Sequence, residues 1–511
     1  MKNKIYFEFL FLFLLGALSS LSLPPYNYVF INFITFSLYF IFLFKKKILG
    51  NKKISFFYGW FFGFGYFATN LYWISISLTF DANFKFLIPI TLVLIPAFLA
   101  IFYGLATYVL FLFKIKKPAS VFFLFSLIFG IIEFFRGTIL TGFPWNLIVY
   151  SFSDNVEILQ ITSFVGTYAF NMFCFSLFMS PSFFLLRENR KDILICFFFL
   201  LSPIILYVNG FSDIKNFQSL SLVKNDYVIR AVGSNIGLNR FYGETETQSV
   251  LNELIDLSNP NLNNKTFFVW PEGIVPNISQ LELSDFKFLF NKRFNENHLL
   301  GIGINNNKTV DNEFRFYNSF SIYDYEINLI QSYNKVKLVP FGEFLPFENI
   351  LEKVGLKSLT NNYQSYSSGG KRDIIEIDQN NFSLKLLPLI CYEIIYSGKI
   401  FKNHEFDYII NISEDGWFGN SIGPKQHYTH SIFRAIESGK YIIRSANNGI
   451  SSIVNPMGII EKEIPFGESG YIDFKEKRIT QATLFSRLGN KMFLIIILLY
   501  IFLIFSFNRN S

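Results

Sequence analysis

The sequence predicts a helical membrane domain of about eight spans joined to a water-exposed α/β domain. Composition is the first reason, because 51% of the residues are hydrophobic, 20% are aromatic and only 16% are charged, whereas soluble domains average about 25% charged residues. Distribution is the second reason, since the apolar residues crowd 1–210 and 491–507. We therefore expect seven spans within residues 1–210, an α/β domain over residues 211–487 and a final span within residues 488–511.

Each expected span supplies the run of about 17 to 25 apolar residues that crosses the hydrocarbon core as a helix. The first run also fits a cleavable signal peptide, because a short basic start precedes it and Ala17, Leu18 and Ser19 resemble a cleavage site. A second apolar run follows almost at once, so we favour an uncleaved span. In chain order the expected spans are 5–23, 28–44, 55–77, 87–113, 120–135, 159–186, 193–208 and 491–507.

Positive charge in the connecting loops predicts the orientation in the membrane. Lys and Arg accumulate in the cytoplasmic loops of membrane proteins, and with eight crossings the four basic clusters of this chain all fall on one face. Both termini are therefore expected in the cytoplasm, and residues 209–490 across the membrane. The clusters are Lys2 and Lys4; Lys45, Lys46, Lys47, Lys52 and Lys53; Lys114, Lys116 and Lys117; and Arg187, Arg190 and Lys191.

Residues 222–475 alternate short β-rich runs with polar loops and amphipathic helices, which is typical of an α/β layered domain. The sequence contains no Gly-rich phosphate loop, CxxC pair or HExxH helix, so we expect no cofactor, no metal and no nucleic-acid partner. The expected strands are 227–233, 266–270, 299–304, 317–323, 382–390, 408–412 and 441–445, with helices over 244–257 and 427–437.

Cys391 is the candidate nucleophile. It follows the apolar run 382–390, and the other two cysteines, Cys174 and Cys196, fall within expected spans. Because proteins in an oxidising compartment usually pair their cysteines, a thiol in the exported domain without a soluble partner indicates reactivity. An isolated cysteine is more often an inert buried thiol, so the assignment depends on the residues that accompany it.

Glu272 and Lys335 accompany Cys391 in the same kind of position, at a strand end or in the loop after it. A thiol with an ordinary pKa of about 8.5 carries little thiolate near neutral pH, so it needs a base, which Glu272 can supply. Lys335 and the backbone N–H of Tyr392 can stabilise the negative oxygen of a tetrahedral intermediate. Taken singly, Glu272 and Lys335 are typical solvent-exposed side chains, but their joint occurrence favours a site.

Three other residues extend this candidate site. Glu343 and Glu393 can each keep Lys335 protonated and aimed, or they can instead anchor their own loops through backbone N–H groups. His427 offers an alternative base in a Cys–His mechanism, which we rank lower because Glu272 and Lys335 already fill the required roles.

The order of Glu272, Lys335 and Cys391 resembles the nitrilase superfamily. The membrane half resembles one membrane-embedded branch of it, the bacterial apolipoprotein N-acyltransferase family, in Glu-Phe-Phe-Arg-Gly at 133–137 and Thr-Gly-Phe-Pro-Trp at 141–145. The resemblance covers almost the whole chain. In the α/β half it continues in order through 411–413, 415–419, 426–427, 434–437 and 444–450.

This resemblance implies a nitrilase-like α-β-β-α sandwich and an acyl transfer. Cys391 would take an acyl chain from a glycerophospholipid as a thioester and pass it to the α-amino group of the diacylglyceryl-cysteine that begins an apolipoprotein. The lipid bilayer is then a third partner, and the implied location is the bacterial inner membrane with the catalytic domain on the periplasmic side. The implied catalytic residues are Glu272, Lys335 and Cys391, supported by Glu343, Glu393 and Tyr392, with Asn235, Trp417 and Phe341 contacting substrate.

The chain departs from the family pattern at three places near the expected site. Residues 232–237 keep Asn-Ile but lose the flanking Gln and Pro, Glu414 stands where the family usually has a smaller polar residue, and Phe241 lies near a position that is often Trp or Tyr. We expect these departures to affect substrate contacts rather than the reaction. The segment 341–370 is more apolar than a plain surface loop, which fits either a flap that dips toward lipid or ordinary packing.

Two other classes of function compete with this interpretation. A membrane-tethered nitrilase-type amidohydrolase would use the same three residues with water as acceptor, but it gives no reason for eight spans. A transporter or structural membrane protein with an appended binding domain would need polar residues or broken helices along several spans, and the spans here are mainly Phe, Leu and Ile.

Glu133 and Arg136 can pair at the end of one span, either as a functional group or as an interfacial clamp.

Overall fold

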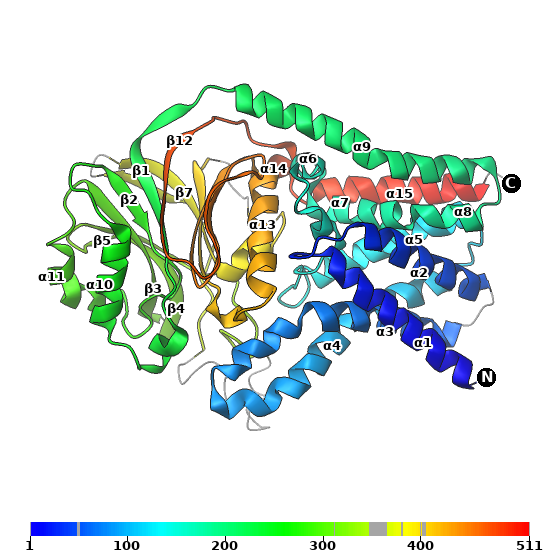
Figure 1. The fold of residues 1–511 in the computed structure, drawn as a ribbon, viewed down its shortest axis with the longest axis horizontal. Helices are drawn as coiled ribbons and strands as arrows, with labels where there is room; N and C mark the ends of the chain where they lie inside the picture. The colour runs from blue at the N-terminus through cyan, green and yellow to red at the C-terminus, as the bar shows by residue number, and fades with distance from the viewer. Residues whose placement is uncertain are drawn as a thin grey trace.

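In the part of the chain that the computed structural model describes, eight long helices form a bundle on one side of the molecule and the α/β domain lies on the other (Figure 1). Those residues are 2–48, 52–310, 312–346, 365–379, 382–398, 400 and 405–509. Within them, six helical segments are long and apolar enough to cross a membrane, and two helices of 19 residues complete the bundle. The eight are α1 (Lys2–Ser19), α2 (Phe30–Ile48), α3 (Lys52–Asn70), α4 (Ile88–Leu112), α5 (Pro118–Arg136), α7 (Thr162–Met179), α9 (Arg190–Ser219) and α15 (Lys491–Arg509).

Each expected span corresponds to one of these helices, with three clear differences in length. The sixth span, expected over 159–186, corresponds to α7 only over Thr162–Met179, and the short helices η5 (Ser180–Ser182) and α8 (Phe183–Leu186) follow it. The third span ends at Asn70 instead of residue 77, and the 3-10 turns η2 (Tyr72–Thr79) and η3 (Ala82–Leu87) follow it. The seventh span, α9, continues to Ser219 and has 30 residues, a length of about 45 Å where the hydrocarbon core is about 30 Å thick. Its polar final turns therefore carry the chain out of the bundle toward the sheets.

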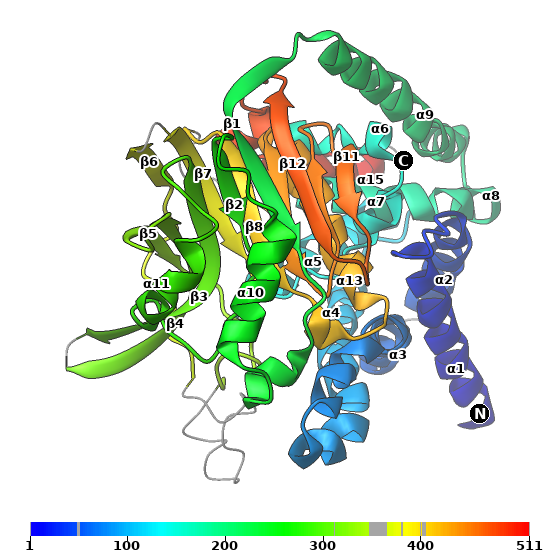
Figure 2. The same ribbon diagram turned by 60° about the vertical axis from the view of Figure 1, so that its left-hand side comes forward.

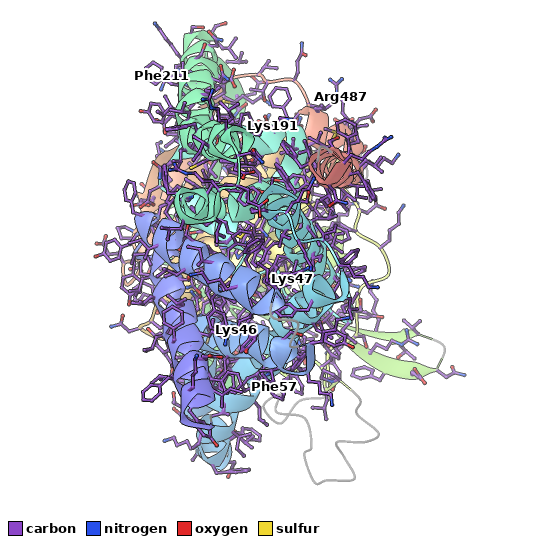
Figure 3. All side chains as sticks on the ribbon, turned by 90° about the vertical axis from the view of Figure 1, so that its right-hand side faces the viewer. Lys46, Lys47, Phe57, Lys191, Phe211 and Arg487 are labelled. Carbon is purple, nitrogen blue, oxygen red and sulfur yellow. The ribbon has the colours of Figure 1, made fainter. Side chains whose placement is uncertain are left out.

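The two chain ends lie at the end of the bundle that is remote from the sheets (Figure 1). Lys46 and Lys47 lie in the last turn of α2, and Lys191 lies in the first turn of α9. Both turns are at this same end, which faces the viewer in Figure 3. Basic residues that are distant in sequence therefore share one end of the bundle. The α/β domain occupies the opposite end.

The α/β domain is an α-β-β-α sandwich. Among the described residues, the strands form two sheets of six, in the orders β12-β1-β2-β3-β4-β5 and β11-β10-β9-β8-β7-β6. Helices α10 (Thr247–Ser258) and α11 (Lys287–Phe290) lie on the outer side of the first sheet, and α13 (Gly423–Ser438) lies between the second sheet and the bundle (Figures 1 and 2). The strands are β1 (Val223–Gly233), β2 (Thr266–Val269), β3 (His298–Val310), β4 (Glu313–Asp324), β5 (Leu329–Asn334), β6 (Ile375–Gln379), β7 (Phe382–Ile390), β8 (Tyr408–Glu414), β9 (Tyr441–Asn447), β10 (Ser451–Val454), β11 (Ile460–Ile464) and β12 (Gly470–Lys477).

Two apolar layers hold the sandwich together. Ile229, Phe267 and Ile410 belong to the layer between the sheets, while Phe268 and Leu254 belong to the layer between the first sheet and its helices. Strand β8 is buried along its whole length because α13 covers one face of its sheet and the other sheet covers the opposite face. Strands covered on both faces are continuous apolar runs in the sequence, which is why β7 and β8 are predictable from it.

Buried polar contacts join the sandwich to the bundle. The Tyr392 hydroxyl donates to the Gly142 carbonyl at 2.9 Å, and the Tyr396 hydroxyl donates to the Thr141 carbonyl at the same distance. The segment that follows β7 therefore lies at the junction of the two halves of the molecule. This junction contains the residues that the sequence marks as reactive.

Candidate active site

Cys391 lies where β7 ends and the 3-10 helix η9 (Cys391–Ile395) begins. Its φ is +48°, in the left-handed region that non-glycine residues rarely adopt. Such a conformation costs about 1 to 3 kcal/mol and persists only where the surroundings hold it. The residue is 9% exposed, so the thiol is enclosed by protein.

Lys335 brings two carboxylates together beside this turn. Its Nζ lies 2.8 Å from Glu272 Oε1 and 2.9 Å from Glu343 Oε1, and the residue is 1% exposed. Glu272 comes from the loop after β2, and Lys335 directly follows β5. Burial alone would lower the pKa of Lys335, but the two carboxylates outweigh it and raise the pKa well above its usual value. The ammonium therefore stays charged at physiological pH.

Asn318 is a member of this cluster that sequence reasoning missed. Its Nδ2 donates to Glu272 Oε1 at 2.7 Å and to Glu343 Oε1 at 2.9 Å. The other oxygen of Glu272, Oε2, accepts the backbone N–H of Glu414 at 2.9 Å. Both oxygens of Glu272 are thus held in place. A buried asparagine within the apolar strand β4 was the available signal, because buried polar groups need partners.

The electrostatic environment of Cys391 keeps its thiol neutral at rest. Burial is the main cause that raises its pKa well above the usual value, the Glu272 carboxylate raises it further, and the Lys335 ammonium opposes the rise. The thiol therefore lies within electrostatic range of both Glu272 and Lys335. A neutral thiol beside a carboxylate requires a proton transfer before it can attack an ester.

Glu343 and Glu393, for each of which the sequence allows either contact with Lys335 or anchoring of its own loop, are placed differently. Glu343 contacts the Lys335 ammonium and also accepts the backbone N–H of Val339 at 2.8 Å. Glu393 instead pairs with Arg372 at 3.0 Å. Its carboxylate also accepts backbone N–H groups on both sides of the site, those of Val336, Lys337 and Ile390 at 2.9 to 3.1 Å, and the Tyr333 hydroxyl.

His427 contacts the backbone of Cys391. Its Nε2 lies 3.2 Å from the Cys391 carbonyl oxygen, and its Nδ1 lies 2.9 Å from Asp415 Oδ1. Burial alone would raise the pKa of Asp415, but Arg444 and His427 lower it to about 2, so the carboxylate is ionised. This geometry directs the imidazole at the carbonyl, which does not favour the alternative Cys–His mechanism.

The three residues expected to contact substrate lie in different surroundings. Trp417 packs against Phe241 at a centroid distance of 5.1 Å and against Phe80 of the membrane half at 6.0 Å. Phe341 is half exposed, while residues 347–364 of the expected flap lie outside the described residues. The side chain of Asn235 is exposed and donates to the Gly467 carbonyl at 3.2 Å, so its contact is with a neighbouring loop.

The departures from the family pattern are connected to this cluster. Glu414 forms a buried ion pair with Arg240, and the guanidinium of Arg240 lies 4.6 Å from the Phe241 ring. The backbone of Glu414 holds Glu272. In the described part of the chain, no group of three His, Cys, Asp or Glu side chains is arranged to hold a metal ion.

Comparison with protein families assigns the two halves separately. Residues 15–179 match the family model of the apolipoprotein N-acyltransferase N-terminal domain. Residues 277–480 match the carbon-nitrogen hydrolase model. The second match includes the loop of Lys335, the turn at Cys391 and helix α13.

Curated relatives match over nearly the whole length. The apolipoprotein N-acyltransferase of Rickettsia prowazekii is 34% identical over 488 residues, which cover 93% of this chain and 94% of that protein. The enzyme of the same name from Rhodopseudomonas palustris is 29% identical over 491 residues, which cover 93% of this chain and 90% of that protein. Among solved structures, Saccharomyces cerevisiae Nit3 of the nitrilase superfamily is 17% identical with a TM-score of 0.35, covering 49% of this chain and 90% of its own.

Proposed function

The chain belongs to the apolipoprotein N-acyltransferase family and is an acyltransferase of lipoprotein maturation, and from this premise we propose its substrates and the roles of its residues. The acyl donor is a glycerophospholipid, and the acceptor is the α-amino group of the diacylglyceryl-cysteine that begins an apolipoprotein. The observation that carries the proposal is the buried cluster of Cys391, Glu272 and Lys335 beside the junction with the membrane bundle.

The first step moves the acyl chain onto the protein. Glu272 accepts the proton of the Cys391 thiol, and the thiolate attacks the ester carbonyl carbon of the phospholipid. The bond from that carbon to the glycerol oxygen breaks, and Glu272 returns the proton to this oxygen. A lysophospholipid leaves, and Cys391 carries the acyl chain as a thioester.

Lys335 and the backbone N–H of Tyr392 stabilise the negative oxygen of each tetrahedral intermediate. Lys335 is buried and stays charged, and Tyr392 lies in the first turn of η9, where N–H groups have no partner within the helix. One such donor contributes about 3 to 4 kcal/mol. In the second step the amine attacks the thioester carbon, the carbon–sulfur bond breaks, and Glu272 transfers the amine proton to the departing sulfur.

Attachment of the catalytic domain to a membrane bundle suits these substrates. Both are anchored in lipid, and withdrawing an acyl chain from the bilayer costs about 0.8 kcal/mol for each CH₂ group. A site at the membrane surface avoids most of that cost. A soluble amidohydrolase, which acts on small polar substrates, needs no such bundle.

We assign the protein to the bacterial inner membrane, with the catalytic domain on the periplasmic side and both termini in the cytoplasm. The clustering of basic residues at the end of the bundle remote from the sheets supports this orientation. In this assignment the membrane domain comprises residues 1–210 and 488–511, and the catalytic domain comprises residues 211–487.

The overall reaction tests the proposal. Purified protein in detergent micelles, given phosphatidylethanolamine and a synthetic diacylglyceryl-cysteine peptide, should yield lysophospholipid and a peptide that is heavier by one acyl group. Mass spectrometry of both products measures this outcome. The matched control is the same peptide with its α-amine acetylated, which should remain unmodified. Free fatty acid released beside an unmodified amine peptide would favour the amidohydrolase instead.

A further inference from the structure

The backbone of the nucleophile needs an external restraint. Cys391 has a φ of +48° without being glycine, so the conformation that presents its thiol is not its preferred one. The carboxylate of Glu393 fixes the preceding residue by accepting the Ile390 N–H at 2.9 Å. On the other side, the Cys391 carbonyl oxygen faces His427 Nε2 at 3.2 Å.

The imidazole of His427 is itself held rigidly. The side chain is fully buried on α13, and its Nδ1 faces Asp415 Oδ1 at 2.9 Å and an Arg444 nitrogen at 3.3 Å. Asp415 Oδ2 accepts from Arg444 at 2.7 Å. A ring with hydrogens on both nitrogens donates to Cys391 and to the ionised Asp415 carboxylate. A neutral ring with its hydrogen on Nε2 donates to Cys391 alone, and its Nδ1 lone pair faces both Arg444 and Asp415 Oδ1, whereas a neutral ring with its hydrogen on Nδ1 donates only to Asp415.

A tryptophan of the membrane half packs against one face of this imidazole. The Trp145 ring stacks on it, with a centroid distance of 5.3 Å and an angle of 17°. Trp145 Nε1 also donates to Gln426 Oε1 at 2.9 Å. Gln426 precedes His427, and its amide donates to Asn70 at 2.8 Å and to the Pro24 carbonyl at 3.1 Å. Three separate segments of the bundle therefore fix the start of α13.

We propose that His427 is a positioning residue, which donates from Nε2 to the Cys391 carbonyl and so maintains the turn that places the thiol beside Glu272 and Lys335. Trp145 fixes the imidazole in the orientation that makes this bond. The inference rests on the proposed role of Cys391 as nucleophile. It implies that the membrane half influences the chemical step as well as anchoring the protein.

Two isosteric substitutions isolate the bond in question. The side-chain nitrogen of His427→Gln can take the place of Nε2, whereas that of His427→Asn can take only the place of Nδ1. We expect acylation of Cys391 by phosphatidylethanolamine in a single turnover to stay within about threefold of wild type in the Gln variant. The Asn variant should be at least about tenfold slower, with an unchanged half-saturating donor concentration.

His430→Phe is the matched control. His430 lies one turn further along α13, is also buried and also contacts Trp145, at 5.4 Å. Within the described residues its Nδ1 has no hydrogen-bond partner. We expect this variant to acylate Cys391 within about twofold of the wild-type rate, because no bond to the nucleophile is lost.

The outcomes separate this inference from the proposed function. Absence of acyl-Cys391 in the wild-type protein would refute the proposed function, and an Asn variant that acylates at the wild-type rate would refute the inference alone. Equal losses in the Gln and Asn variants would also overturn it, because only a general structural role would remain. If the Asn variant does not fold, Trp145→Leu provides the test. We expect this variant to acylate Cys391 at least about threefold more slowly than wild type, and acylation at the wild-type rate would contradict the proposal.

Discussion

At the residue scale, the site is a shared cation between two carboxylates, with a neutral thiol next to them. Lys335 bridges Glu272 and Glu343, and Asn318 bridges the same two oxygens from its own side. This arrangement holds Glu272 in place and keeps Lys335 charged, as the proposed proton transfer and oxyanion stabilisation require. Burial keeps the pKa of the Cys391 thiol well above its usual value, so the thiol is protonated at rest.

The reactivity of Cys391 should therefore rise with pH. Its thiolate is the reactive form, and because burial raises the thiol pKa, the thiolate fraction should increase about tenfold per pH unit between about pH 7 and 9. Alkylation by iodoacetamide, followed by mass spectrometry of the peptide that contains Cys391, measures this slope. A rate that levels off below about pH 8 would contradict the raised pKa, and Cys391→Ala controls for labelling elsewhere.

The sequence identifies the proposed reactive residues more readily than their partners. Glu272, Lys335 and Cys391 are recognisable because each follows an apolar run and their order matches a family. Asn318 and Arg372 are not recognisable in this way, because their roles depend on which strand ends meet across the sandwich. The contact of His427 with the Cys391 carbonyl likewise depends on how α13 packs against η9.

At the scale of elements, two carboxylates that look equivalent in sequence belong to different parts of the fold. Glu343 touches the ammonium of Lys335, whereas Glu393 joins the loop after β5 to the end of β7 through backbone N–H groups. Glu343 stabilises the positive charge of Lys335. Glu393 fixes the relative position of the two segments that carry Lys335 and Cys391.

Glu343→Gln and Glu393→Gln should therefore fail in different ways. We expect Glu343→Gln to slow acylation of Cys391 at least about tenfold, a loss of about 1.4 kcal/mol in transition-state stabilisation, with little change in thermal stability. Glu393→Gln should also lower the free energy of unfolding, by about 3 to 5 kcal/mol, because it leaves the Arg372 charge without its carboxylate.

Single-turnover labelling and thermal unfolding of the two variants check this distinction. Wild-type acylation in Glu343→Gln would remove Glu343 from the site. A Glu393→Gln variant as stable as wild type would show that its contacts with the backbone contribute little to the fold.

Edge strands are the elements that the sequence does not predict. β5, β6, β11 and β12 lie at the edges of the two sheets, and β10 is the short neighbour of β11. β11 and β12 contain several charged residues because one side of each faces water. The apolar runs of β11 and β12 are consequently too short to be distinguished from loops, and the buried strand β10 has only two apolar residues, Ile453 and Val454. The other strands that are covered on both faces are evident from the sequence.

At the scale of the whole molecule, buried polar contacts join the bundle to the sandwich, several of them beside the turn that contains Cys391. Tyr392 and Tyr396 bond to the loop after α5, and Gln426 bonds to α3 and to the loop after α1. The spans are predictable from their length and apolarity. These contacts between the halves are not, since they depend on how two separately patterned regions dock.

The proposed orientation predicts which surfaces a membrane-impermeant maleimide can reach in intact cells. Glu468→Cys lies on an exposed loop of the catalytic domain, and Lys116→Cys lies exposed between α4 and α5. After the outer membrane is permeabilised, we expect labelling at position 468 but labelling at position 116 only once the inner membrane is also opened. Labelling in the reverse pattern would invert the assigned topology.

The formation of an acyl-enzyme is the central claim, and intact-mass measurement tests it most directly. Purified protein incubated with phospholipid, without an acceptor amine, should gain the mass of one acyl chain on the peptide that contains Cys391. Neutral hydroxylamine should remove this mass, because it cleaves thioesters. Absence of the added mass, or an adduct that persists in Cys391→Ala, would contradict transfer through a cysteine thioester.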